Sequence, residues 1–166
     1  MNWMRRGVAT LAAGLLMTAA AAAEDVVRYR APNSNLPIAQ AVEIPAGKGM
    51  VYLSGAVPTA VNQTVDTNTV EAYGDTKTQT ESVLKAIEET LGTLGLKMGD
   101  VVKMQVFLVG DPAGGGKMDF GGFMEAYNQH FGTEAQPNLP SRSVVQVAGL
   151  ANPGFLVEIE VTAVRP

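Results

Sequence analysis

Near its C-terminus the chain reads Pro140-Ser-Arg-Ser-Val-Val-Gln-Val-Ala-Gly-Leu-Ala-Asn-Pro-Gly-Phe-Leu-Val-Glu-Ile-Glu-Val-Thr-Ala-Val164. Two runs rich in β-branched residues flank a turn with Asn, Pro and Gly at 152–154, a pattern typical of a β-hairpin. Because side chains alternate between the two faces of a strand, Glu158 and Glu160 share one face of the second run. We expect the rest of the fold to be organised around this hairpin.

The predicted hairpin brings an arginine close to two carboxylates. If the chain folds back at Leu150 or Ala151, Arg142 lies roughly opposite Glu158 and Glu160, on one side of the sheet. A cross-strand ion pair is one interpretation of this arrangement, and a functional cluster is the other. Apolar side chains share that side, so it is not simply a solvated face.

The N-terminus has the pattern of a secretory signal peptide. Arginines at 5–6 precede an apolar, alanine-rich run over 7–20, and Ala21-Ala22-Ala23 offers a cleavage site. A membrane anchor is the alternative, but the run is shorter and richer in alanine than a span of roughly 20 apolar residues. The flanking residues fit general secretion better than twin-arginine export. We predict a signal peptide at 1–23 and a periplasmic or secreted domain at 24–166, with no stable membrane association after cleavage.

Composition narrows the classes of function. The mature chain is long enough for one domain with one core. The 166 residues include no cysteine and one histidine, and the formal net charge is −4. Without cysteine no disulfide forms, and a single histidine argues against a zinc site. The acidic balance gives no support for nucleic-acid binding.

Hydrophobic periodicity predicts two helices and about six strands. Apolar residues recur at helical spacing over Thr76–Leu94 and over Asp119–His130. The predicted strands cover 26–30, 41–44, 50–53, 101–109 and the two runs of the hairpin. This order predicts one α+β domain in which a mixed sheet carries both helices on one face. The other face, half apolar and carrying Arg142, Glu158 and Glu160, should pack against another subunit.

Three other segments offer weaker signals. The glycine-rich loop 110–117 is not a phosphate-binding loop, because Asp111 and Met118 stand where that motif needs Gly and Ser or Thr. His130 ends the second helix, where a histidine usually interacts with the helix dipole. Residues 59–75 are polar and poorly periodic, so we predict an extended surface loop there.

Several short motifs occur in order along the mature chain. They are Tyr52-Leu53-Ser54-Gly55, Gln79-Thr80-Glu81, Gly99-Asp100-Val101-Val102-Lys103, the helical stretch Phe123–Phe131, Pro140-Ser141-Arg142-Ser143 and Val157-Glu158-Ile159-Glu160. Together they resemble the RidA/YjgF family, also called endoribonuclease L-PSP. The resemblance implies a chorismate mutase-like α+β fold and a homotrimer with small-molecule clefts between subunits. It also implies hydrolysis of reactive 2-imino or enamine acids to 2-keto acids and ammonia.

The resemblance assigns roles to residues at matching positions. Arg142 matches the arginine that grips the substrate carboxylate, an anion that a guanidinium binds bidentately. Glu158 matches the acid that positions the attacking water, and Glu160 stays open as the alternative. Ser54 and Gly55 match residues that line the cleft. The resemblance implies no metal and no cofactor.

Two positions depart from the pattern of active members. Ile38 stands where those members often have Tyr, and Met124 stands where they often have Asn. Both changes remove polar groups from the cleft, so we expect a more apolar cleft around these two substrate-binding candidates. Its substrate could then be different or larger, or deamination could be weak or absent.

More than one function therefore stays open. The first is an exported imine or enamine deaminase. The second is a non-catalytic trimer that binds a small carboxylate in the same cleft. A structural or chaperone-like trimer would tolerate replacement of Arg142. A ribonuclease would need a basic groove and a suitably placed histidine, which this sequence lacks.

Overall fold

The computed structural model describes residues 25–166, and the predicted signal peptide lies outside them. The strands and α-helices are β1 (Val27–Tyr29), β2 (Ala41–Glu43), β3 (Met50–Tyr52), α1 (Thr76–Thr93), β4 (Val101–Val109), α2 (Phe120–His130), β5 (Ser141–Val147) and β6 (Val157–Val164). In this part of the chain, no helix is both long enough and apolar enough to cross a membrane.

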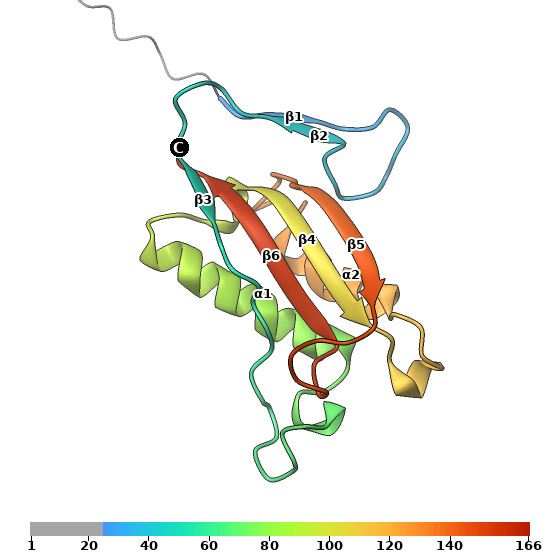
Figure 1. Ribbon diagram of the computed structural model, residues 1–166. Helices are drawn as coiled ribbons and strands as arrows, with labels where there is room; N and C mark the ends of the chain where they lie inside the picture. The colour runs from blue at the N-terminus through green and yellow to red at the C-terminus, as the bar shows by residue number, and fades with distance from the viewer. Residues whose placement is uncertain (1–24) are drawn as a thin grey trace, which may run out of the picture.

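Four of the strands form one mixed sheet in the order β3-β6-β4-β5. β4 runs parallel to β5 and antiparallel to β6, and β3 runs antiparallel to β6. Both helices cover the same face of this sheet (Figure 1). The predicted α+β class, with two helices on one side of a mixed sheet, is therefore confirmed.

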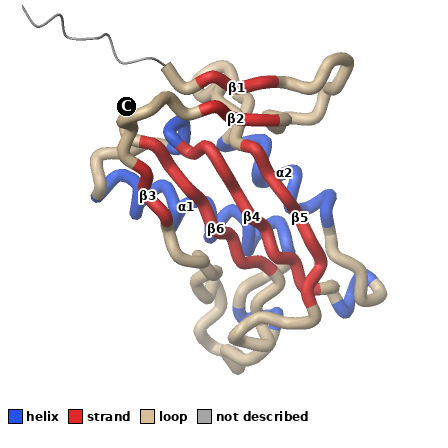
Figure 2. Tube along the Cα trace, turned by 45° about the horizontal axis from the view of Figure 1, so that its top comes forward, coloured by secondary structure: helices blue, strands red, loops and turns tan. Residues whose placement is uncertain are grey.

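The remaining two strands do not join the main sheet. β1 and β2 pair only with each other, as an antiparallel ribbon beyond the end of the sheet where β4 and β5 begin (Figure 2). Four of the six predicted strands therefore form the main sheet, and the other two form this separate ribbon. Arg28 in β1 connects the two parts, because its guanidinium donates to backbone carbonyls at the start of β4 and just before β5.

The predicted hairpin of β5 and β6 is wrong. β4 lies between these strands and pairs with both of them. The connection over 148–156 is too long for a tight turn, and it crosses the end of β4 instead. Its far end is held by Gln79 of α1, whose side chain donates to Gly154 O (3.0 Å) and accepts from Leu156 N (2.7 Å).

Local signals set the ends of both helices. Asp75 caps α1 by accepting from Thr78 N (2.8 Å), and Asp119 caps α2 by accepting from Gly122 N (2.9 Å). Gly95 ends α1 with a φ of +71°, a conformation that glycine adopts without strain. The helices begin and end close to where the hydrophobic periodicity predicted.

The core lies between the helices and the sheet. Side chains of both helices and of β4 and β6 are almost fully buried there: Val83, Leu84, Ile87, Leu91, Met104, Val106, Leu108, Phe123, Tyr127, Ile159 and Val161. The segment 59–75 also contributes, because Ala72 and Tyr73 are buried. This segment contains a 3-10 turn at Val70–Ala72, so it is less extended than predicted.

Candidate functional site

Arg142 lies on the helix side of the sheet. It is in register with Met104, which in turn pairs with Val161, and both neighbours are buried beneath the helices. Glu158 and Glu160 alternate with the buried residues of β6 and therefore face the other way. The prediction that Arg142 shares a face with these glutamates is wrong, because it rested on direct pairing of β5 with β6.

Residues of α2 surround the Arg142 guanidinium. Its Cζ lies 4.1 Å from the ring centroid of Tyr127 and 5.0 Å from that of Phe123. Its Nη2 donates to the Met124 sulfur at 3.2 Å. A cation over two aromatic rings is stabilised by their π faces, whereas a thioether is only a weak hydrogen-bond acceptor.

One nitrogen of this guanidinium donates no hydrogen bond to the described part of the chain. Nη1 of Arg142 is buried and has no hydrogen-bond partner among the described residues. Burial lowers the pKa of Arg142, the Tyr127 side chain opposes that effect, and a guanidinium stays charged in proteins. A buried cation with an unfilled donor favours an anionic ligand, and a carboxylate matches the geometry of the fork.

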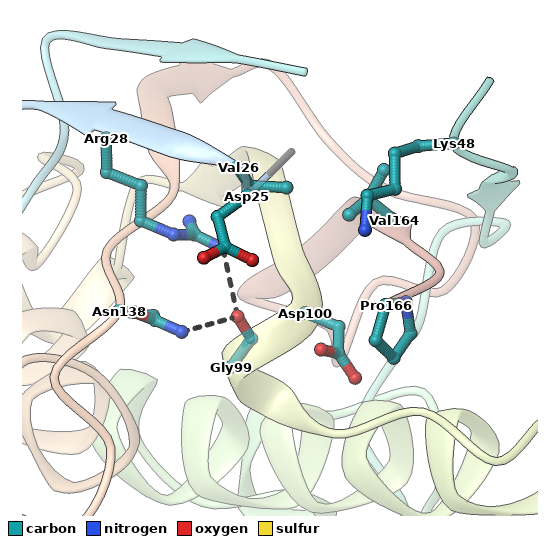
Figure 3. A pocket seen from close by; sticks show the side chains of 9 residues that line it. All are labelled: Asp25, Val26, Arg28, Lys48, Gly99, Asp100, Asn138, Val164 and Pro166. Carbon is teal, nitrogen blue, oxygen red and sulfur yellow. Dashed lines mark hydrogen bonds between the residues drawn. The ribbon is translucent and has the colours of Figure 1, made fainter. Parts of the chain in front are cut away.

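Arg28 provides a contrast within the same molecule. Its Nη1 donates to Val101 O (2.9 Å) and Leu139 O (2.6 Å), and its Nη2 donates to Gly99 O (2.9 Å). Arg28 stands beside a cavity of about 370 Å³ (Figure 3), which is also lined by Asp25, Lys48, Asp100, Asn138 and Pro166. Because both terminal nitrogens of Arg28 donate to backbone carbonyls, we assign this side chain a structural role.

Ser54 and Gly55 form a bulge beside β6. Leu53 N donates to Val161 O (3.0 Å) and Ala56 N donates to Ile159 O (2.9 Å), which leaves the two intervening residues opposite one residue of β6. The bulge lines a groove of about 410 Å³ that continues along α1 past Ile87, Thr90 and Leu94.

The Glu158 carboxyl group lies against Gly55. A Cβ atom at position 55 would stand 2.8 Å from the Glu158 Cδ, so this glycine leaves the space that the carboxyl occupies. Glu160 instead lines a cavity of about 300 Å³ on the face without helices, together with Tyr52, Lys103 and Gln105. Of the two glutamates, only Glu158 therefore lies against Gly55, and Glu160 lines the cavity beside Lys103 and Gln105.

The predicted site residues fall into two groups within one protomer. Arg142 and Met124 lie at the β5 edge of the sheet, whereas Ser54, Gly55 and Glu158 lie toward the β3 edge. Ile38 belongs to the first group through its neighbour Pro37, whose carbonyl accepts from the Tyr127 hydroxyl at 2.9 Å. One protomer does not bring the two groups together.

Tyr127 is a site residue that the sequence reasoning missed. Its helical spacing with Phe123 and Phe131 is typical of core residues, and its side chain is fully buried. Yet the Arg142 guanidinium lies over its ring, and its hydroxyl donates to the Pro37 carbonyl. Burial raises the pKa of Tyr127 to about 12, so the hydroxyl stays protonated near neutral pH. Only knowledge of which strand faces α2 could have distinguished this tyrosine from an ordinary core aromatic.

The candidate residues of this chain include an arginine, a carboxylate and a glycine-lined groove. Over residues 25–166, no three side chains of His, Cys, Asp or Glu gather in a metal-binding arrangement. Such a set can bind a small carboxylate and orient a water molecule.

Comparison with known proteins identifies the family of this chain. The sequence pattern of the family described as Endoribonuclease L-PSP matches residues 28–165. The chain belongs to this family, which is the RidA/YjgF family. Family membership, expected from the motifs, is thereby confirmed.

One relative in the family is named for a specific reaction. The 2-iminobutanoate/2-iminopropanoate deaminase of Escherichia coli K12 is 31% identical over 140 residues, which cover 84% of this chain and 96% of that protein. TdcF from the same strain is 35% identical over 136 residues, covering 82% and 92%.

Solved structures of family members have the same fold. E. coli TdcF with bound serine superimposes with a TM-score of 0.55 at 32% identity, over 86% of this chain and 99% of that one. The E. coli yjgF gene product superimposes with a TM-score of 0.54 at 32% identity, over 82% and 94%.

Proposed function

We propose that this protein hydrolyses reactive 2-imino or enamine acids to 2-keto acids and ammonia, in a cleft between two copies of the chain. The observation that carries the proposal is the Arg142 guanidinium, whose buried Nη1 has no hydrogen-bond partner within residues 25–166 and whose Nη2 donates to a thioether. A substrate carboxylate would take both donors as a bidentate pair. The relatives named as deaminases of 2-imino acids support the choice of reaction.

The proposed chemistry needs little beyond positioning. A 2-imino acid is already electrophilic at its imine carbon, so holding it beside an oriented water molecule supplies much of the rate. Arg142 fixes the carboxylate end. Glu158 accepts a proton from the water as the oxygen adds to the imine carbon, and this proton passes to the nitrogen. The hydroxyl of the resulting carbinolamine then loses its proton to the nitrogen as the C–N bond breaks, which releases ammonia and the 2-keto acid. Gly55 leaves the space that the Glu158 carboxylate occupies, and Ser54 is its neighbour in the bulge.

A second copy of the chain is part of the proposal. Arg142 and Glu158 face opposite ways in one protomer, so the cleft forms only where the β5 edge of one copy meets the β3 edge of another. The face without helices supports such packing, because Tyr52 is 75% exposed and Val145 is 47% exposed there. We propose the homotrimer that the family resemblance implies.

A non-catalytic carboxylate-binding protein is the second candidate. It is favoured by one observation: within residues 25–166, the neighbours that the Arg142 guanidinium contacts are aromatic rings and a thioether, with no carboxylate among them. The serine bound in the TdcF structure is a small carboxylate of this class. Replacing Glu158 separates the candidates, since Glu158→Gln should remove turnover but leave carboxylate binding in place.

The test follows the decay of imino acids generated in situ by an amino-acid oxidase. Wild-type protein should accelerate the decay, and Arg142→Ala should reduce the acceleration on the order of 100-fold or more. Arg30→Ala, at an exposed arginine, is the matched control and should retain wild-type activity. Equal activity of Arg142→Ala and wild type would contradict the proposal. No acceleration by the wild type, together with binding of a 2-keto acid, would favour the second candidate.

We also propose that the protein is exported and cleaved before Glu24, on the strength of the signal-peptide pattern over 1–23. N-terminal sequencing of the protein recovered from a bacterial periplasm should begin at Glu24. A cytosolic protein that retains residue 1 would contradict this proposal.

A further inference from the structure

Tyr127 contacts two parts of the Arg142 site that are far apart in sequence. Its ring lies 4.1 Å from the Arg142 Cζ, and its hydroxyl donates to the carbonyl of Pro37 at 2.9 Å. The side chain has no exposed surface, so neither contact is a chance arrangement of a mobile group.

The ring is held firmly on its other sides. Phe131 stacks on it with centroids 4.8 Å apart and planes 16° apart, and Phe123 lies 5.7 Å away. The neighbouring rings of Phe123 and Phe131 therefore hold the Tyr127 ring, and with it the aromatic face that the guanidinium contacts, in a fixed position. Since a desolvated cation gains from an aromatic face, the ring sets where the Arg142 fork points.

The hydroxyl fixes the segment that precedes the ribbon strand β2. Pro37 is tied to Tyr127, and Ala39 N donates to Pro140 O at 3.0 Å. Ile38 therefore sits between two anchored neighbours, and Pro140 is only two residues from Arg142. Loss of the hydroxyl would free one of these anchors and leave the other.

We propose that Tyr127 is a positioning residue with two separable roles: its ring orients Arg142 toward the substrate carboxylate, and its hydroxyl holds Ile38 where it selects among substrate side chains. This inference rests on the proposed function and deepens it by naming the group that controls selectivity. Because Ile38 is apolar, and so is Met124 beside Arg142, the selected substrates are 2-imino acids with apolar side chains.

Two variants separate the two roles. Tyr127→Phe keeps the ring and removes the hydroxyl, whereas Tyr127→Leu removes both. Tyr29→Phe is the matched control, because Tyr29 also loses a hydroxyl hydrogen bond, to Glu43, at an exposed position. Each protein is checked for thermal stability and oligomeric state. Carboxylate binding is then measured by calorimetry with 2-oxobutanoate and, for comparison, with its amide.

The expected results differ between the variants. Tyr127→Phe should bind 2-oxobutanoate with nearly wild-type affinity. Its ratio of kcat/KM for a large apolar imino acid over a small one should change by about threefold or more. Tyr127→Leu should bind the carboxylate about tenfold more weakly, and its weak affinity for the amide should change little. Tyr29→Phe should match the wild type in every measurement.

Two results would overturn the inference. One is a Tyr127→Phe protein with unchanged selectivity, and this variant decides the question even if Tyr127→Leu does not fold. The other is a folded Tyr127→Leu protein that binds 2-oxobutanoate as the wild type does. These outcomes differ from failure of the proposed function, in which the wild type itself neither binds the 2-keto acid nor hydrolyses imino acids. That failure would refute both proposals.

Discussion

Arg142 and Glu158 point to opposite faces of the same sheet, from strands that are separated by β4. The side chain of Arg142 reaches the helix layer, and that of Glu158 lies against Gly55 near the other edge. A reaction that needs both residues therefore requires two copies of the chain. Whether the protein can carry out such a reaction therefore depends on how its copies assemble.

The close approach of Gly55 to Glu158 predicts the effect of adding one methyl group. Gly55→Ala should push the Glu158 carboxyl aside, and misplacement of a catalytic group by about 1 Å can cost roughly 100-fold in rate. Imino-acid turnover should therefore fall by about 10- to 100-fold, with 2-oxobutanoate binding at Arg142 largely retained. Gly149→Ala is the matched control, since a Cβ there meets nothing within 4 Å. Equal turnover in the two variants would argue against a catalytic Glu158.

The side chain of Gln79 in α1 is hydrogen-bonded to the connection over 148–156, which crosses the end of β4. It is fully buried and makes hydrogen bonds with Gly74 O, Gly154 O and Leu156 N. Gln79→Ala leaves these buried backbone groups without partners, and each such group costs about 1–3 kcal/mol. We expect the free energy of unfolding in urea to drop by about 3 kcal/mol. A drop below about 1 kcal/mol would show that water replaces the side chain without cost.

Asp75 should give α1 a stability that depends on pH. Its pKa is lowered mainly because its carboxylate accepts the backbone N–H of Thr78 at the helix N-terminus. Because this pKa is lowered by folding, the ionised carboxylate stabilises the folded protein above the usual pKa of about 4. This stabilisation is lost as the pH falls through the pKa that Asp75 has in the folded protein. Asp75→Ala should cost about 1 kcal/mol at pH 7 and less below about pH 3.

Urea unfolding at the two pH values measures this difference. Glu88→Ala, at an exposed position in the same helix, serves as the control and should change stability little at either pH. A cost of Asp75→Ala that is the same at pH 7 and below pH 3 would contradict the electrostatic explanation.

Tyr127 should ionise later than an ordinary tyrosine. Burial raises its pKa to about 12, above the usual value of about 10. The neutral form is thus favoured by folding, and the associated stability is present below about pH 10 and lost between about pH 10 and 12. In an absorbance titration of phenolate, Tyr127→Phe should lack this late component. A wild-type protein whose tyrosines have all ionised by about pH 10.5 would contradict it.

Much of the fold could be predicted from local patterns. The helical spacing of Val83, Leu84, Ile87 and Leu91, with Gly95 beyond them, gave α1 nearly to the residue. Strand neighbours could not be predicted in the same way. The turn residues at 152–154 fit a hairpin, but the pairing of β5 was decided by contact with β4, which is remote in sequence.

The same error explains what was missed in the site. The structure gives two of the predicted site residues distinctive surroundings: Nη1 of Arg142 is buried without a partner among the described residues, and Glu158 occupies the space beside Gly55. Their distribution over two faces, and the role of Tyr127 beneath Arg142, follow from strand order. Strand order depends on distant packing, which one sequence does not show locally.

The most direct test of the intersubunit cleft mixes two inactive proteins. Arg142→Ala and Glu158→Gln are unfolded together in equal amounts and refolded, so that mixed oligomers form. If each cleft takes Arg142 from one copy and Glu158 from its neighbour, about a quarter of the clefts contain both native residues. Imino-acid hydrolysis should then return to about a quarter of the wild-type rate. Activity no higher than that of either variant refolded alone would contradict a site shared between subunits.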